Sequence, residues 1–371
     1  MKTKIFELFV LLLILTLTEN ANAQLTIPPD GGNKKAAISE QIGITMVTVD
    51  YNRPHVKGLE GHIWGELIPV GFFDPGSGTA KSAPWRAGAN ENTTISFSTD
   101  VKIAGQYLPA GKYGLFVAYD PDECTIIFSK NSTSWGNFYY NPAEDILKVK
   151  VKPVKNNTSV EWLKYEFADE TDSSAELQLE WEKLIIPFKI NVDLVSTQLA
   201  SFRMELRGEK GFDWENLAQA ALYCVKHKVN LDEALLWANA ATSENSSGFH
   251  EFKAWTIKAM VIDSLGRTQE ADEAMKTGTP FGDVVEFYHY ARLLAKKKQF
   301  DNALKIYLLN AVKNPDDFIA NLGLARGYSG IGNLKKAMYY AKRAQSQAED
   351  DTNKRLTAKI IDDLTQHKDI S

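Results

Sequence analysis

The spacing of hydrophobic residues changes near residue 196, and this change is the strongest constraint on how the chain can fold. From about residue 38 to residue 195, apolar and polar residues alternate, as they do in strands with one buried and one solvated face. From about residue 196 to the end, the apolar residues follow the period of an α-helix. We therefore predict a β domain over residues 38–195 and an α-helical domain over residues 196–371.

Short alternating runs fill the β half, and turn signals such as Pro109-Ala110-Gly111 separate several of them. Clear examples are the runs 95–99, 113–119, 147–151, 177–182 and 186–194. Many short strands without intervening helices predict an antiparallel β-sandwich. The alternation changes parity near Met46, where we expect either a β-bulge or a strand with both faces buried.

Small residues recur in the helical half at the spacing of a helical hairpin. Six alanines fall at two equivalent positions of successive units, Ala259, Ala291 and Ala325 at one and Ala271, Ala303 and Ala337 at the other. This spacing resembles the tetratricopeptide repeat (TPR), with three units over about residues 252–350. Residues 213–245 resemble a degenerate fourth unit and residues 351–367 a polar capping helix. A generic helical bundle is the alternative, and Ala348 is expected on a polar face.

Residues 1–23 have the features of a cleavable secretory signal peptide. Lys2 and Lys4 precede an apolar stretch too short to span a bilayer, and Ala21-Asn22-Ala23 is a small-x-small cleavage site. We predict a mature chain that starts at Gln24, a flexible leader over residues 24–37 and a periplasmic or secreted location. No Cys follows the cleavage site, so no lipoprotein anchor is expected, and no later segment is apolar enough to span a membrane.

Composition and motifs argue against several classes of function. The net charge of −5 argues against a nucleic-acid partner. No histidine has a second His or a Cys nearby at metal-ligand spacing, and no phosphate-binding loop or nucleophile motif is present, so we expect neither metal nor cofactor. Cys124 and Cys224 fall in different predicted domains and are expected to be buried thiols.

Polar and aromatic residues are dense between residues 51 and 94. An Arg beside a Trp can stack on the ring and bind a carboxylate or phosphate through two N–H groups. One interpretation is therefore a site for a small anionic or glycan ligand. The other is structural, with the arginines bound to buried acids or carbonyls and the Trp in the core. The candidate ligand-binding residues are Tyr51, Arg53, His55, Lys57, Trp85, Arg86, Asn90 and Lys112.

Two functions are compatible with this sequence. The first is an exported, non-enzymatic binding protein, in which the helical repeats engage a protein partner and the β domain offers the small-ligand site. The lack of a recognisable catalytic constellation favours it. The alternative is an envelope enzyme acting on a glycan or small anionic substrate through Arg53, His55, Arg86 and Asn90, with His55 as acid or base.

A second aromatic group, residues 135–140, is expected to be mostly buried.

Several longer segments of the β half resemble an exported bacterial family, domain of unknown function 2911. They include residues 51–54, 63–65, 84–94, 108–115 and 135–136. The resemblance covers roughly residues 38–195, and it implies that this stretch is one domain, often followed by helical repeats. The family has no established activity, so the resemblance implies neither substrate nor cofactor.

Overall fold

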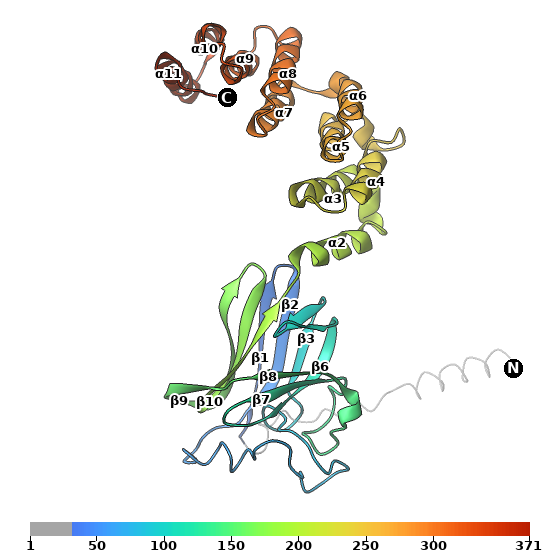
Figure 1. Cartoon of the computed structure of the whole chain (residues 1–371), viewed down its shortest axis with the longest axis vertical. Coiled ribbons are helices and arrows are strands. Elements are labelled where there is room, and N and C mark those ends of the chain that lie inside the picture. The colour runs from blue at the N-terminus through green and yellow to red at the C-terminus, as the bar shows by residue number, and fades with distance from the viewer. Residues whose placement is uncertain (1–31) are drawn as a thin grey trace, which may run out of the picture. The chain divides into compact units, whose positions relative to one another are not determined.

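The chain contains two compact units, one ending at Thr197 and the other beginning at Gln198. A computed structural model describes residues 32–371, so the predicted signal peptide and most of the predicted leader lie outside the described residues. The first unit consists of antiparallel strands and the second of helices, which confirms the predicted fold class (Figure 1). None of the helices in residues 32–371 is both long enough and apolar enough to cross a membrane.

The β unit is a sandwich of two antiparallel sheets. The first sheet has the order β1-β2-β3-β6-β7-β8 and the second the order β5-β4-β10-β9. The first consists of β1 (Lys34–Ile42), β2 (Thr45–Arg53), β3 (Thr94–Phe97), β6 (Gly111–Ala118), β7 (Cys124–Ser129) and β8 (Asp145–Val151). The second consists of β4 (Val101–Ile103), β5 (Gln106–Leu108), β9 (Val154–Thr171) and β10 (Ser174–Asn191). Both sheets contribute buried side chains to one hydrophobic core.

The change of parity near Met46 comes from a hairpin turn. In the pairing of β1 with β2, Ile42 lies opposite Thr45, which leaves Gly43 and Ile44 as a two-residue loop. Gly43 has a φ of 60°, the backbone conformation that such tight hairpins require. The predicted bulge and its alternative, a strand buried on both faces, are therefore wrong: Ile42 ends β1, Val47 and Val49 lie in β2, and Ile44 and Met46 between them are exposed.

A bulge does occur in β10, where two strands were expected. The register with β9 shifts on both sides of Glu182, whose φ is 50°. Before the bulge the buried apolar residues have odd numbers, from Leu177 to Trp181, and after it they have even numbers, from Ile186 onward. The extra residue keeps both apolar runs on the core side of one long strand.

The ends of the β unit also differ from the prediction. Strand β1 starts at Lys34, so residues 34–37 of the predicted leader pair with residues 50–53 of β2. Ala36 packs against the core from this segment, which explains why it is ordered as a strand. At the other end, Leu194 starts helix α2 (Leu194–Glu205) instead of ending a strand.

The loop between β2 and β3 covers part of the first sheet from outside. Ala80 and Ala83 of this loop form a small second core with Phe116, Ile127 and Tyr140. Strand β6 is therefore buried on both faces over residues 113–118. This packing holds the loop against the sheet and fixes the walls of a pocket described below.

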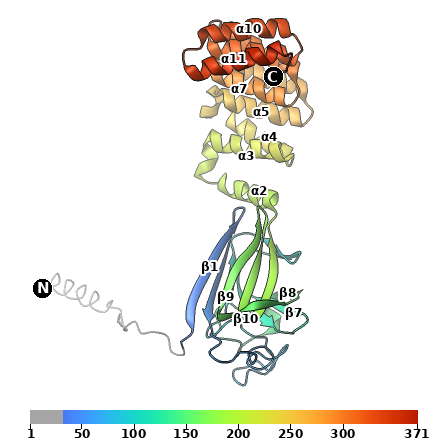
Figure 2. The same cartoon turned by 90° about the vertical axis from the view of Figure 1, so that its left-hand side faces the viewer.

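The α unit is a TPR-like series of helical hairpins (Figures 1 and 2). The hairpins are α3 (Trp214–His227) with α4 (Leu231–Ala241), α5 (Phe252–Ser264) with α6 (Thr268–Gly278), α7 (Val284–Lys296) with α8 (Phe300–Lys313), and α9 (Phe318–Gly330) with α10 (Leu334–Gln347). Helix α11 (Asp351–Thr365) packs against α10. Short 3₁₀ turns cover Pro142–Glu144, Glu209–Phe212, Ser247–His250 and Thr279–Phe281.

All six alanines of the repeat pattern are buried. Helix pairs approach closely where these small side chains lie, and Gly266 and Gly332, each with a φ of 78°, form two of the turns between paired helices. Ala348 is also buried, with 8% of its surface exposed, so its expected place on a polar face is wrong. It caps the C-terminal end of α10, where the chain turns toward α11.

Candidate functional site

The structure does not bring the eight predicted ligand-binding residues together. They separate into three groups, which occupy different parts of the β unit. Trp85, Arg86 and Asn90 line one pocket, Tyr51 and Lys112 line a second, and Arg53, His55 and Lys57 line neither of these two.

The third group fastens the chain after β2 to strand β9. The Arg53 guanidinium donates through Nε to the Leu163 carbonyl at 2.7 Å. The His55 ring packs edge-on against Trp162, with 4.8 Å between ring centres. Lys57 is exposed, and its backbone N–H donates to a glutamate side chain of β9 at 3.1 Å. These contacts are structural, because the Arg53 guanidinium and the Lys57 backbone N–H have partners on β9 and the His55 ring packs against that strand.

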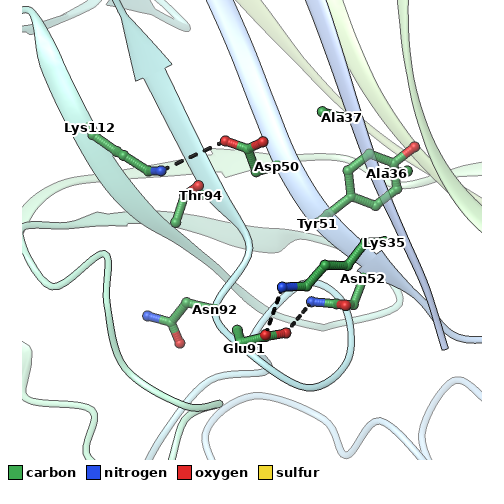
Figure 3. A pocket seen from close by; sticks show the side chains of 10 residues that line it. All are labelled: Lys35, Ala36, Ala37, Asp50, Tyr51, Asn52, Glu91, Asn92, Thr94 and Lys112. Atoms are coloured by element: carbon green, nitrogen blue, oxygen red, sulfur yellow. Dashed lines mark hydrogen bonds and ion pairs between the residues drawn. The ribbon is translucent and has the colours of Figure 1, made fainter. Parts of the chain in front are cut away.

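The second pocket is an open hollow of about 560 Å³ on the outer face of the first sheet, here called the charged hollow (Figure 3). Lys35 Nζ lies 2.9 Å from the Glu91 carboxylate, which also accepts a hydrogen bond from Asn52 at 2.7 Å. The bond from Lys35 holds the pKa of Glu91 below its ordinary value. Lys112 Nζ lies 3.7 Å from the Asp50 carboxylate. Each charge thus faces an opposite charge, and the hollow has no excess charge to attract an ion.

Sequence reasoning found only part of this hollow. Lys112 was among the predicted residues, but the Tyr51 side chain is buried, and its hydroxyl accepts the Tyr165 backbone N–H at 3.2 Å. Lys35, Asp50 and Glu91 were missed. They alternate with apolar residues or flank a strand, as charges do on any solvated strand face, so no local signal distinguishes them.

The first pocket, here called the Arg86 pocket, has a volume of about 330 Å³. Its walls come from the loop between β2 and β3, from the segment between β7 and β8, and from β10. The Arg86 guanidinium donates through Nη1 to the Asn90 carbonyl at 2.9 Å and lies 5.2 Å from the centre of the Phe138 ring. A Cβ at Gly136 would lie 2.5 Å from Nη1, so only glycine leaves room for the guanidinium there.

The charge of Arg86 is not compensated within the described residues. Burial lowers the pKa of its guanidinium, and no carboxylate of residues 32–371 forms an ion pair with it. Trp181 also lines the pocket, and its buried indole N–H has no acceptor in the same part of the chain. Trp85 stacks on Trp181 with 6.0 Å between ring centres. The pocket therefore combines a positive charge and N–H donors with aromatic walls.

A strained turn presents Arg86 to this pocket. Ala87 and Asn90 have φ values of 52° and 56°, in the left-handed region that non-glycine residues rarely adopt. The Ala87 carbonyl accepts hydrogen bonds from the hydroxyls of Thr93 at 3.0 Å and Tyr165 at 2.9 Å. Such strain costs on the order of 1–3 kcal/mol per residue and persists only where the surrounding fold holds it.

The aromatic segment 135–140 is less buried than expected. Trp135 and Tyr139 are 56% and 55% exposed, whereas Tyr140 is buried. The buried Asn137 donates to the Pro84 carbonyl at 2.8 Å and thereby fixes the segment beside Arg86. Tyr139 lies between these two anchors and Trp135 precedes them, and the prediction of burial was wrong for both rings.

The helical array contains a groove of about 690 Å³ across the C-terminal ends of α3, α5 and α7, here called the basic groove. Its apolar lining consists of Leu222, Val225, Leu231, Met260 and Leu293. Its charged lining consists of Lys226, Lys228 and Lys297, without any acidic residue. None of these lysines forms an ion pair within residues 32–371. The spacing of Leu222 and Val225 on one helix face was the available signal, but core residues share it.

Two other predictions concern reactive groups. Cys124 and Cys224 are free, buried thiols, as expected. Within the described chain, no group of three His, Cys, Asp or Glu residues is placed to hold a metal ion.

Comparison with known families gives a match in the β unit. Residues 33–190 match the family described as Protein of unknown function (DUF2911). This match confirms the resemblance seen in the sequence. The residues that line the charged hollow and the Arg86 pocket all lie within this matched stretch. None of the curated proteins matches the chain.

Several solved structures are similar to this chain. MamA from Desulfovibrio magneticus is 16% identical, with 43% of this chain and 92% of MamA covered and a TM-score of 0.27. A tetratricopeptide repeat protein from Parabacteroides merdae is 17% identical, with 43% and 61% covered and a TM-score of 0.29. YrrB, described as a TPR protein with an unusual peptide-binding site, is 16% identical, with 45% and 91% covered and a TM-score of 0.27.

Proposed function

We propose that this protein is a non-enzymatic binding protein whose helical array engages a protein partner through the basic groove. The observation that carries the proposal is the lining of the groove, which combines apolar side chains from three successive hairpins with three lysines and no acid. Apolar surface left open between repeat units is typical of a partner-binding face. The predicted signal peptide supports a periplasmic or secreted location for this binding.

The chemistry of the groove indicates the kind of segment that fits it. Leu293 is 43% exposed, and Leu222, Val225 and Met260 are half-buried beside it. Apolar side chains of a partner would cover this surface and gain roughly 25 cal/mol per Å² of apolar area removed from water. The unpaired lysines at the edge favour a partner segment with acidic residues, because opposite charges raise association rates and fix the orientation.

Site-specific photo-crosslinking in the native host tests this proposal. A crosslinking residue at position 293 should give a defined adduct with a partner, whereas one at Val312 should not. Val312 is the matched control because it is 79% exposed in α8, outside the groove. Equal adducts from both positions, or none from position 293, would refute the assignment of the groove.

Charge-reversal variants provide a second, independent test of partner binding in the basic groove. Lys226→Glu combined with Lys297→Glu should reduce the adduct several-fold, because the variant replaces attraction by repulsion. Lys335→Glu with Lys342→Glu changes the net charge equally on α10 and should leave the adduct unchanged. A similar loss in both pairs would show a general charge effect instead of a docked partner.

We further propose that the β domain binds a small anionic ligand in the Arg86 pocket. The uncompensated guanidinium of Arg86 supports this version over a glycan ligand, because a neutral sugar would leave that charge unpaired. A thermal-shift screen of simple anions and sugars against the chain and its Arg86→Gln variant tests it. Stabilisation by an anion that disappears in the variant is expected, and stabilisation by sugars alone would refute it.

The enzyme alternative gains no support from the geometry. His55 packs on Trp162 outside the Arg86 pocket, and Arg53 is bound to backbone carbonyls of β9. An acid or base must lie within hydrogen-bond reach of the group on which it acts, and His55 is not among the residues that line the pocket.

A further inference from the structure

We infer that the Arg86 pocket binds an apolar monocarboxylate, with the carboxylate on the Arg86 guanidinium and the apolar part against the aromatic walls. The inference rests on the proposed small-anion function of the β domain and adds the class of ligand. Three features of the pocket support it: the free donors of the Arg86 guanidinium, the nature of the walls and the size.

The charged hydrogen-bonding group of the pocket is a donor. An arginine has five N–H donors in a planar fork, and the structure gives Arg86 one acceptor within residues 32–371, the Asn90 carbonyl. The amide of Asn137 is bound to the Pro84 carbonyl. The side chains of Asn33 and Asn90 bond to each other at 3.2 Å. Arg86 is the only charged residue among the described residues that line the pocket, and the remaining N–H donors of its guanidinium favour an acceptor with negative charge.

The guanidinium is held in a fixed orientation. Gly136 lies against it on one side, where a Cβ would come within 2.7 Å of Cζ, and the Phe138 ring also contacts it. A fixed planar fork matches the two oxygens of a carboxylate, which are then bound by parallel hydrogen bonds. Phosphate oxygens fit the same fork, so the walls must decide between the two anions.

The walls are rich in carbon. Besides the two tryptophans and Phe138, the lining includes Pro54, Leu67, Ile68, Phe73 and Pro75. A phosphate or sugar presents polar atoms on every side, and those that face carbon would lose the hydrogen bonds they make in water. A carboxylate with an apolar body places its polar end on Arg86 and its remaining surface on carbon. A volume of about 330 Å³ suits a small molecule.

Ligand-observed NMR titrations of the chain from Gln24 onward test the inference with four probes: phenylacetate, its neutral analogue phenylacetamide, inorganic phosphate and glucose. Phenylacetate should bind, and phenylacetamide should bind at least about tenfold more weakly, since it lacks the charge-assisted bond. Phosphate should not displace phenylacetate. Equal binding of phenylacetate and phenylacetamide would overturn the inference.

Three variants tie the binding to the pocket. Arg86→Gln should weaken phenylacetate at least about tenfold, and Arg86→Lys several-fold, because lysine keeps the charge but loses the fork. Gly136→Ala should weaken binding with Arg86 still present, since the new Cβ displaces the guanidinium. These last two variants keep the test valid if Arg86→Gln does not fold. Lys112→Gln removes one positive charge from the charged hollow and should leave binding unchanged.

The outcomes separate this inference from the broader proposal. Tight phosphate binding that depends on Arg86 and excludes phenylacetate would overturn the apolar carboxylate and leave the small-anion function standing. Binding of glucose alone, or of none of the probes, would overturn both. Phenylacetate binding that appears only after residues 24–31 are removed would assign the pocket to the chain's own N-terminal segment and overturn the inference.

Discussion

At the scale of single residues, Gly76 and Gly78 lie in one loop but differ in the space available for a Cβ. Replacing each by alanine should therefore affect stability differently. Both glycines have a φ of 73°. A Cβ at Gly76 would meet no atom within 4 Å, whereas one at Gly78 would lie 2.2 Å from the Phe138 carbonyl oxygen. That oxygen accepts the backbone N–H groups of Thr79 and Ala80, each at 3.0 Å. The loop therefore positions Phe138, which contacts Arg86.

Alanine substitutions at the two glycines should differ accordingly. Gly76→Ala should cost about 1–2 kcal/mol, the penalty of a left-handed backbone for a residue with a Cβ. Gly78→Ala should cost about 1–3 kcal/mol more, because backbone atoms must move. Hydrogen exchange of the peptides around residues 134–140 measures the difference. Equal protection in both variants would show that the loop does not hold Phe138 in place.

Cys124 offers a prediction about reactivity. Burial raises the pKa of its thiol from 9.0 to about 11. Because the folded state holds this proton more tightly, the thiol favours folding below pH 9, and this contribution is lost as the pH rises toward 11. At pH 8.5 the folded chain should contain about a hundredfold less thiolate at Cys124 than the unfolded chain.

Iodoacetamide labelling at pH 8.5 measures this difference at the residue. We expect modification of Cys124 at least about a hundredfold slower in the native chain than in denaturant. Cys224 is the internal comparison, since burial raises the pKa of that thiol as well. Rapid labelling of native Cys124 would show that the β core opens on the time scale of the experiment.

At the scale of elements, the repeat alanines set the distance between helices. Ala303 of α8 is 1% exposed and belongs to the core shared by α7, α8, α9 and α10. Ala303→Leu should therefore overpack the array and cost about 1–3 kcal/mol. In a repeat array each unit contacts its neighbours, so the loss of hydrogen-exchange protection should be largest in α7 to α10.

Ala358 is the matched control for this substitution. It lies on an exposed face of α11, where an added side chain meets solvent. Ala358→Leu should change the unfolding temperature little, because leucine and alanine both favour helices. Scanning calorimetry of the two variants decides the matter. Shifts of equal size would mean that the repeat register assigned to Ala303 is incorrect.

At the scale of the whole molecule, each unit has its own hydrophobic core. The main cluster of the β unit, over residues 36–194, includes no residue of the helical array beyond Thr197. The clusters around Phe287 and Tyr307 include no residue of the β unit, as far as residues 32–371 are concerned. Units that bury separate cores are expected to fold separately.

A fragment of residues 24–197 should therefore fold by itself. Its β10 peptides should show the same hydrogen-exchange protection as in the full chain, because their partners in β9 and β4 are all present. The fragment 198–371 should likewise remain helical. A β fragment that loses this protection, while the full chain keeps it, would show that its stability depends on the array.

Local patterns in the sequence determined the fold class and the repeats. A period of two or of 3.6 residues records which side chains are buried, and the buried alanines at 303 and 337 follow directly from it. Parity alone did not separate a hairpin from a bulge, because both move the buried positions by one residue. Only strand pairing placed the hairpin at Gly43 and the bulge at Glu182.

The candidate sites depended on tertiary structure to a much greater extent. Arg53, Arg86 and Lys112 were predicted to share one site because they are near one another in the sequence. Strand direction and loop packing place them in different parts of the β unit. Gly136, which lies against the Arg86 guanidinium, and Trp181, which lines the same pocket, are 50 and 95 residues further along the chain. No local pattern encodes such contacts, because they arise only when the two sheets and the covering loops pack against one another.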